Sequence, residues 1–149
     1  MNTGFLVRPG TEAEAKAIAC LLDELGYPAD TQAVSGRLCR LMSRPDHLVA
    51  VAESADGQLC GWLQALSSET LESGFRAEIV GLVTSKTMRR RGIGRLLVEY
   101  AESWAARLGA TTLVVRTNVK REESHAFYAA LGYGRTKTQH VYRKPLRQD

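Results

Sequence analysis

One stretch of the sequence, residues 77–97, limits strongly what the chain can fold into. It begins with an apolar run, continues through a polar segment with three successive arginines, and reads Gly92-Ile93-Gly94 before an amphipathic run. The first run predicts a strand and the last a helix. Because the glycines have no side chains, a ligand can approach the backbone closely at the turn between these elements.

The predicted turn has the properties of a phosphate-binding site. The first N–H groups of a helix have no partner within it and lie at the positive end of its dipole. Arg89, Arg90, Arg91 and Arg95 add positive charge around the turn. We therefore expect a phosphorylated ligand here, such as one that carries a pyrophosphate.

Two common phosphate-binding signatures do not fit this turn. A dinucleotide fingerprint requires a third glycine three residues after the second, and Leu97 occupies that position. The P-loop pattern requires a Gly-Lys-Ser/Thr string that does not occur. What remains is Arg89-x-x-Gly92-x-Gly94, which resembles the acetyl-CoA signature of the GNAT superfamily of N-acyltransferases.

The order of elements along the chain is similar to the fold of that superfamily. Periodicity, caps and turn residues predict the order β-αα-βββ-α-β-α-ββ. The expected strands are 4–8, 47–53, 58–66, 78–84, 111–117, 133–137 and 139–144, the helices 11–26, 34–42, 92–108 and 122–131, and residues 67–75 a loop. We expect one α/β (α+β) domain over residues 1–149, with a mixed sheet of about seven strands flanked by about four helices.

A second motif near the C-terminus strengthens the resemblance. Residues Arg121 to Tyr133 are similar to the family segment N-x-x-A-x-x-F/L-Y-x-x-x-G-F/Y. Arg121 stands where Asn is common and Ser124 where Ala is common. Two motifs in the right order, within the expected order of elements, are a specific signal.

Charge and cysteine content indicate the class of protein and its environment. Residues 1–75 hold 5 Lys/Arg and 10 Asp/Glu, and residues 76–149 hold 15 and 6, so the second half suits an anionic ligand. Cys20, Cys39 and Cys60 show no metal spacing and lie in apolar patterns, which predicts reduced core or near-core residues. With no apolar run of about 20 residues, we expect a cytoplasmic protein that does not enter a membrane.

The proposed chemistry needs a base, because an alkyl ammonium must lose a proton before it attacks a thioester. Glu78 is the candidate: it lies fourteen residues before Gly92, in the register where some GNAT enzymes keep a catalytic glutamate. A period of two places it on the same strand face as Leu82 and Thr84. The alternative is a strand-end glutamate that faces solvent or pairs with an arginine.

Tyr128 is the candidate general acid for the departing thiolate. The resemblance implies a position next to the coenzyme sulfur, and a neutral phenol can donate a proton there. The alternative is a core aromatic residue. Phe127, Ala130 and Leu131 already supply an apolar stripe, which leaves Tyr128 freer to face a cleft.

The resemblance also implies the residues that hold acetyl-CoA, the acyl donor. Backbone groups of Leu82, Val83 and Thr84 would bind the pantetheine arm, and Arg121 and His125 are further candidate contacts. The pyrophosphate would lie against Arg89, Arg90, Arg91, Gly92, Ile93, Gly94 and Arg95. No histidine has a spacing that suggests a metal ligand, so no metal is expected.

The sequence therefore predicts an acetyl-CoA-dependent N-acetyltransferase that uses direct transfer in a ternary complex. Its acidic first half, including Asp23, Glu24, Asp30, Glu69 and Glu72, favours a cationic small-molecule amine as acceptor. A silent acyl-CoA sensor, or an enzyme acting on a protein lysine or N-terminus, stays open as an alternative. A nucleic-acid partner is disfavoured because the arginines crowd one turn, and relatives often form a homodimer.

Overall fold

The computed structural model describes residues 4–147 of the chain. The chain divides into two compact units, Met1–Arg116 and Thr117–Asp149. The first unit holds a five-stranded sheet and three α-helices, and the second holds one further helix. The single domain over residues 1–149 stays a prediction.

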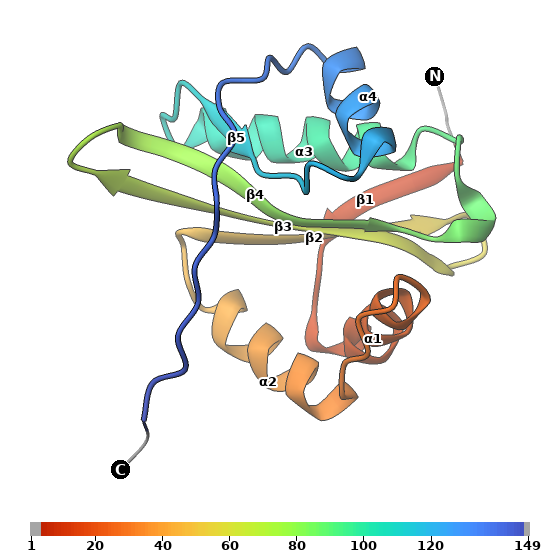
Figure 1. Ribbon diagram of the computed structural model, residues 1–149. Coiled ribbons are helices and arrows are strands. Elements are labelled where there is room, and N and C mark those ends of the chain that lie inside the picture. Colours follow the sequence, from red (N-terminus) through yellow and green to blue (C-terminus); the bar gives the residue numbers. More distant parts are fainter. Residues whose placement is uncertain (1–3, 148–149) are drawn as a thin grey trace. The chain divides into compact units, whose positions relative to one another are not determined.

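The sheet of the first unit follows the order β1-β2-β3-β4-β5. Its first four strands are antiparallel neighbours, and the short β5 runs parallel to β4. Helices α1 and α2 cover one face and α3 covers the other (Figure 1). The strands are β1 (Phe5–Pro9), β2 (His47–Ser54), β3 (Leu59–Thr70), β4 (Gly74–Thr84) and β5 (Leu113–Val115), and the helices α1 (Ala15–Glu24), α2 (Thr31–Met42) and α3 (Ile93–Arg107).

Each face of the sheet has its own apolar core. On the α1/α2 face, Val51 belongs to a buried cluster with Ile18 and Leu38. On the other face, Leu97 and Val98 of α3 are fully buried. The amphipathic helices predicted from periodicity therefore form as expected, because each can bury its apolar stripe against a strand face.

A β-bulge in β4 interrupts the alternation of its side chains. Ala65 of β3 lies opposite Ile79, but the next β3 residue, Gln64, lies opposite Gly81, so Val80 is an extra residue. One extra residue reverses which side chains face which side of the sheet. Ahead of the bulge Ala77 and Ile79 share a face, and beyond it Leu82 and Thr84 share that face.

The expectation that Glu78 shares a face with Leu82 and Thr84 is therefore wrong. Glu78 lies opposite Leu66, whereas Leu82 and Thr84 lie opposite Leu63 and Gly61. Leu66 and Leu63 are three residues apart and point to opposite faces. Glu78 thus faces the α1/α2 side, and the physical reason is the bulge at Val80.

Trp62 covers the backbone of β4 just beyond the bulge. Its ring packs against the α1/α2 cluster, and a Cβ built on Gly81 would lie 2.8 Å from the ring atom Cζ3 and 3.0 Å from Cη2. Among the described residues, none accepts a hydrogen bond from its buried Nε1–H. Gly81 is therefore required here by close packing rather than by a special backbone angle.

The start of α1 is fixed by a charged network. The Glu14 carboxylate accepts hydrogen bonds from the Thr11 hydroxyl at 2.8 Å and from Arg8 Nη2 at 2.8 Å, and Arg8 also contacts Glu53 at 3.2 Å. Thr11 and Glu14 form the predicted capping box around a short 3-10 helix, Glu12–Glu14. Burial raises the pKa of the Glu14 carboxyl, but the hydrogen bonds from Arg8 and Thr11 outweigh it and leave that pKa below its usual value.

The second unit contains α4 (Glu122–Ala130), close to the predicted helix 122–131. Residues 133–147 have no regular secondary structure and most are exposed, so the predicted strand pair 133–137 and 139–144 is wrong. The segment is mostly polar, and an isolated two-stranded hairpin is marginal in water. The described residues therefore hold five strands rather than about seven.

Two smaller expectations also differ from the structure. Residues 67–75 are not a loop, because β3 and β4 continue through them to a turn, as solvated antiparallel strands can. Cys60 is buried, whereas Cys20 and Cys39 are exposed, and all three are free thiols.

Among the described residues, no helix has the length and apolar character needed to cross a bilayer.

We expect Gly81→Ala to lower the free energy of unfolding by about 1–3 kcal/mol, because the new methyl group meets the six-membered ring of Trp62. Phenylalanine lacks the two ring atoms nearest to Gly81. The penalty for Gly81→Ala should therefore be smaller in a Trp62→Phe background. Urea denaturation of wild type, the two single variants and the double variant measures both penalties. Equal penalties in the two backgrounds would contradict this packing.

We expect Glu14→Gln to lower the free energy of unfolding by about 1–2 kcal/mol at neutral pH. Because the folded-state pKa of Glu14 is lowered, its contribution is present above the ordinary value of 4.5 and is lost as the pH falls through the folded pKa. The gap between wild type and variant should thus shrink progressively as the pH falls below 4.5. The control is Glu72→Gln in the exposed β3–β4 turn, and a pH-independent gap would refute the assignment.

Candidate functional site

The sheet opens at the end of β4. β5 pairs with β4 only from Ala77 to Ile79, so among residues 4–147 the only strand that pairs with β4 from Gly81 to Thr84 is β3. The Ser85 N–H donates to Cys60 O at 2.9 Å, which makes Ser85 and Cys60 a hydrogen-bonded pair. Since such pairs alternate, Leu82 and Thr84 direct their N–H and C=O groups away from β3, toward the open edge.

Val83, between Leu82 and Thr84, directs its backbone groups toward β3 instead. It lies opposite Trp62, in register with a hydrogen-bonded pair, so the ladder with β3 uses its backbone groups. Its side chain is buried on the α1/α2 face. Of the three residues predicted to offer backbone groups, Leu82 and Thr84 are the ones oriented to do so.

The segment between β4 and α3 brings the predicted glycine turn to this same end of the sheet. It contains a short 3-10 helix, Lys86–Met88, and its backbone is left-handed at Arg90 and at Gly92, with φ of 66° and 80°. A Cβ on Gly61, which lies opposite Thr84, would be 3.1 Å from Ile93 Cγ2 and 3.1 Å from Leu97 Cδ1. The first turns of α3 therefore pack on the sheet beside the open edge.

The first turn of α3 offers backbone donors. Gly92 is the N-cap, makes no side-chain cap and accepts from Leu96 N–H at 3.1 Å, the first bond of the helix. The N–H groups of Ile93, Gly94 and Arg95 precede that bond and so have no acceptor within the helix. An anion placed at this end would find three donors and the positive end of the dipole.

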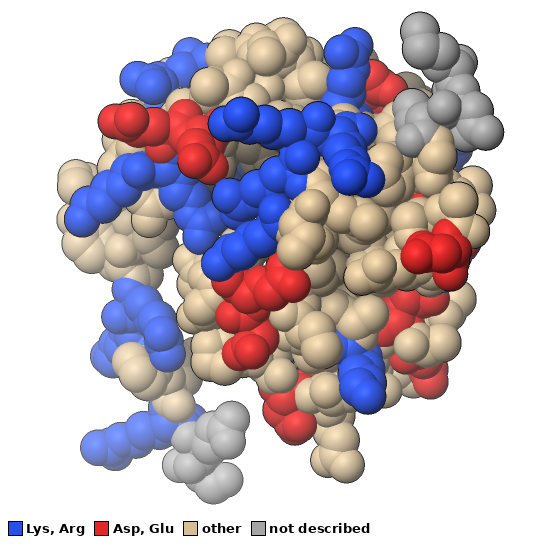
Figure 2. All heavy atoms as spheres, turned by 90° about the vertical axis from the view of Figure 1, so that its right-hand side faces the viewer, with Lys and Arg blue, Asp and Glu red and all other residues tan. Residues whose placement is uncertain are grey.

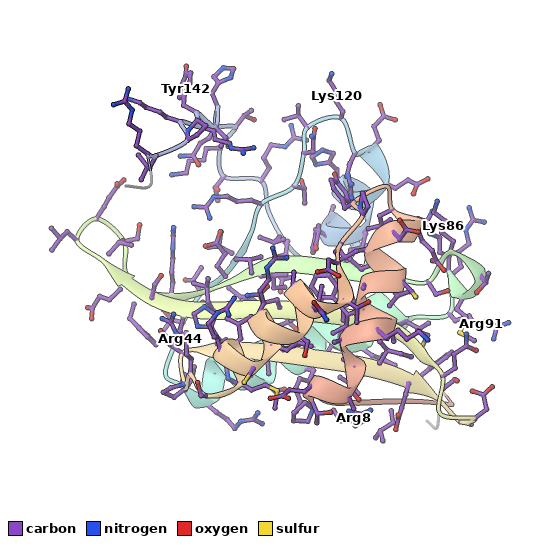
Figure 3. All side chains as sticks on the ribbon, turned by 90° about the horizontal axis from the view of Figure 1, so that it is seen from below. Arg8, Arg44, Lys86, Arg91, Lys120 and Tyr142 are labelled. Atoms are coloured by element: carbon purple, nitrogen blue, oxygen red, sulfur yellow. The ribbon has the colours of Figure 1, made fainter. Side chains whose placement is uncertain are left out.

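Basic side chains surround this helix end. Lys86, Arg89, Arg90, Arg91 and Arg95 are all exposed. Figure 2 turns the side that carries the β4–α3 segment toward the viewer and shows Lys and Arg side chains crowded there. In Figure 3, Lys86 and Arg91 lie on that same side of the ribbon, far from Arg44. Arg95 also forms an exposed ion pair with Glu99 at 2.9 Å, one helical turn later.

Glu78 is paired with Arg116, a residue that the sequence analysis did not single out. Arg116 Nη1 contacts Glu78 Oε1, and the side chains are 52% and 16% exposed. This ion pair confirms the alternative prediction, that Glu78 pairs with an arginine. In the sequence, the position of Arg116 at the end of a β-branched run indicates that it lies near the end of a strand. Only the parallel register of β4 and β5 identifies Glu78 as its partner.

In the second unit, Tyr128 lies on α4 between two aromatic rings. Its ring is edge-on to Phe127, with centroids 4.9 Å apart, and to Tyr133 at 5.8 Å. Burial raises the pKa of Tyr128 to about 12, so the phenol stays protonated well above neutral pH. Within residues 4–147, no group forms a hydrogen bond with its hydroxyl.

His125, also on α4, is held by the segment before that helix. Its Nε2 lies 3.1 Å from Asn118 O and 3.2 Å from Val119 O, and its Nδ1 lies 3.4 Å from Thr117 Oγ1. Two carbonyl acceptors require the proton on Nε2. Arg121 is the N-cap residue of α4 and is exposed. The His125 contacts fix the conformation of the segment that leads into α4.

Comparisons with known proteins agree with the fold and the motifs. Residues 16–133 match the family described as Acetyltransferase (GNAT) family. An uncharacterized N-acetyltransferase of Bacillus subtilis (strain 168), YhdJ, is 28% identical over 129 residues, covering 85% of this chain and 87% of its own. An aminoglycoside N(6')-acetyltransferase type 1 of Klebsiella aerogenes is 27% identical over 153 residues, covering 98% and 100%.

A solved structure shares the architecture. The aminoglycoside N-acetyltransferase AAC(6')-Iy in complex with CoA superposes with a TM-score of 0.84 at 18% identity, covering 95% of each chain. At that identity the likeness shows the fold alone. The family match spans both motifs, the α3 glycine turn and the α4 segment. The chain belongs to the GNAT family of acetyltransferases.

Proposed function

We propose that the chain transfers the acetyl group of acetyl-CoA to a primary amine on a small cationic molecule, by direct attack in a ternary complex. The observation that carries the proposal is the donor set at the end of β4. Leu82 and Thr84 face an open strand edge, and three uncapped N–H groups begin α3 beside it. This set suits a ligand with amide groups at one end and phosphates at the other.

The fit to coenzyme A rests on matching chemistry. A pantetheine arm carries amides that can pair with Leu82 and Thr84 as an added strand would. A pyrophosphate suits the N–H groups of Ile93, Gly94 and Arg95, together with the side chains of Arg89, Arg90 and Arg91. The complex of AAC(6')-Iy with CoA supports this choice of co-substrate.

The reaction needs two proton transfers that residues of this chain can serve. We assign Glu78 as the base that takes a proton from the acceptor ammonium. The neutral amine then attacks the thioester carbonyl, a C–N bond forms and the C–S bond breaks. Backbone N–H groups at the β4 edge suit the developing oxyanion. Tyr128 is assigned to give its proton to the departing thiolate, and the proton that the new amide nitrogen must lose restores the Tyr128 hydroxyl. The raised pKa of Tyr128 keeps it protonated before the transfer.

Charge supports a cationic acceptor, and the positions of the acidic residues in the fold indicate which of them could contribute. Glu69 and Glu72 lie at the β3–β4 turn, before β4 begins at Gly74. An 11-residue strand separates them from Thr84, and at about 3.4 Å per residue that is over 30 Å. Asp30 is the N-cap of α2, and its side chain accepts a hydrogen bond from Gln32 N–H at 3.4 Å, so it has a structural role.

Glu24 and Glu78 are better placed to attract a cation. Glu24 ends α1 and accepts from Lys86 N–H at 3.3 Å, which places its carboxylate at the segment that follows β4. Glu78 lies on the α1/α2 face of β4 itself. The relative of Klebsiella aerogenes is named for aminoglycosides, which are cationic polyamines, and this supports the same acceptor class for the present chain.

We expect thiol release from acetyl-CoA in the presence of an aminoglycoside or polyamine, and a fall in turnover of roughly tenfold to a thousandfold for Tyr128→Phe. Phenylalanine keeps the edge-on ring contacts and removes only the hydroxyl. Steady-state kinetics with a thiol reagent measure both proteins. The matched control is Tyr142→Phe, at a tyrosine that is 92% exposed (labelled in Figure 3).

The same assay separates the alternatives. Binding of acetyl-CoA without thiol release from any amine would overturn the proposed transfer in favour of a sensor. Activity confined to peptides with a lysine or a free N-terminus would overturn the small-molecule acceptor. Activity that is highest on uncharged amines and insensitive to ionic strength would remove the argument from charge.

We also expect Gly92→Ala to weaken binding of coenzyme A by about tenfold or more, while Gly109→Ala leaves it unchanged. Both glycines are left-handed, with φ of 80° and 89°, and neither would crowd a neighbour with a Cβ, so each substitution should cost about 1–2 kcal/mol of stability. They lie at opposite ends of α3. Isothermal titration with coenzyme A measures the affinity, and equal effects of the two variants would contradict phosphate binding at the N-terminal end.

A further inference from the structure

We propose that Arg116 is a positioning residue that holds the Glu78 carboxylate toward the acceptor amine. The inference rests on the proposed function, in which Glu78 takes the proton. Its basis is the ion pair between Arg116 Nη1 and Glu78 Oε1 at the point where β5 leaves β4.

The strand register brings the two residues together. Glu78 lies opposite Val114 in the parallel pair, and Arg116 follows Val114 by two residues. Residues two apart on a strand face the same side, so Arg116 lies diagonally across from Glu78 on the α1/α2 face. Because β5 ends at Val115, Arg116 is the first residue beyond the paired part of the strand.

The exposures of the two side chains suit this role. The Glu78 side chain is only 16% exposed, while that of Arg116 is 52% exposed. The carboxylate is therefore largely shielded and needs a partner, and the guanidinium reaches it from the solvent side. The recorded contact joins Arg116 Nη1 to Glu78 Oε1, and the proposal assigns the proton from the acceptor to the other oxygen, Oε2.

Orientation is the effect expected to dominate. A glutamate has three side-chain torsions, and a charge-assisted hydrogen bond fixes one oxygen and with it the direction of the other. Removal of the positive charge would also make the carboxylate a stronger base, which alone would favour the reaction. Misplacement of a reacting group by about 1 Å can cost a hundredfold in rate, which is the larger effect.

Another arginine provides a matched control on the same strand. Arg76 is two residues before Glu78, opposite Ser68 in the same register, and so lies on the same face of β4. It carries the same charge but lies on the side of Glu78 away from the open edge. Arg76→Gln removes one positive charge from this face without removing the Arg116 contact.

The experiment is a double-mutant cycle on the intact chain, with kcat and both KM values measured for each protein. We expect Arg116→Gln to lower kcat by about tenfold or more, with KM for acetyl-CoA within about twofold of wild type. In a Glu78→Gln background the same substitution should change kcat by less than about twofold. Arg116→Lys should restore most of the rate, because a lysine ammonium can also donate to Oε1 from this position. Arg76→Gln should leave kcat unchanged.

The outcomes distinguish this inference from the proposed function. If wild type releases no thiol with any amine, the proposed function fails and the inference falls with it. If wild type is active but Arg116→Gln is equally active, or loses the same factor with and without Glu78, only the inference is overturned. A loss confined to KM for acetyl-CoA, or one not rescued by Arg116→Lys when thermal unfolding is unchanged, also overturns it.

Discussion

The site depends on one constraint, the separation of β5 from β4 after Ile79. An unpaired strand edge is usually a liability, because its N–H and C=O groups invite pairing with other chains. Here the extra residue at Val80 adds local twist just where β5 ends, and bulges of this kind re-aim or end strand pairing. The result is a short edge, limited to Leu82 and Thr84, that can accept an extended ligand.

The glycine turn can contribute to the candidate site because helix packing on the sheet holds it beside that edge. Helix α3 buries Leu97 and Val98 against the strands, and its first turn lies against Gly61, opposite Thr84. A Cβ at Gly61 would lie 3.1 Å from Ile93 Cγ2 and from Leu97 Cδ1, so the absence of a side chain there lets this end of the helix pack closely on the sheet. Core packing on the α3 face thus fixes where the free N–H groups lie, and the arginines add charge to a position that the backbone has already set.

The sequence predicted well what depends on local patterns. The capping box at Thr11, the Asp56-Gly57 hairpin and the helix that begins after Gly92 all formed, because each depends on residues close together in the chain. The sequence did not reveal the bulge, since no residue type marks it and Gly81 is there to make room for Trp62. The sequence also did not identify Arg116 as the partner of Glu78, because that contact depends on the parallel register between two strands whose residues lie 38 positions apart.

The bulge also bears on how two substrates could be bound at once. It turns Glu78 to the α1/α2 face, while the glycine turn, proposed to bind phosphate, belongs to the helix on the other face (Figure 1). In a ternary complex the acceptor would then approach the β4 edge from the α1/α2 side and the coenzyme from the α3 side. If all residues of β4 paired regularly, Glu78 and Leu82, four positions apart, would share a face of the sheet. Under the proposed function, the bulge therefore places the proposed base and the proposed phosphate-binding turn on opposite sides of the sheet, so that the two substrates could approach the β4 edge from separate sides.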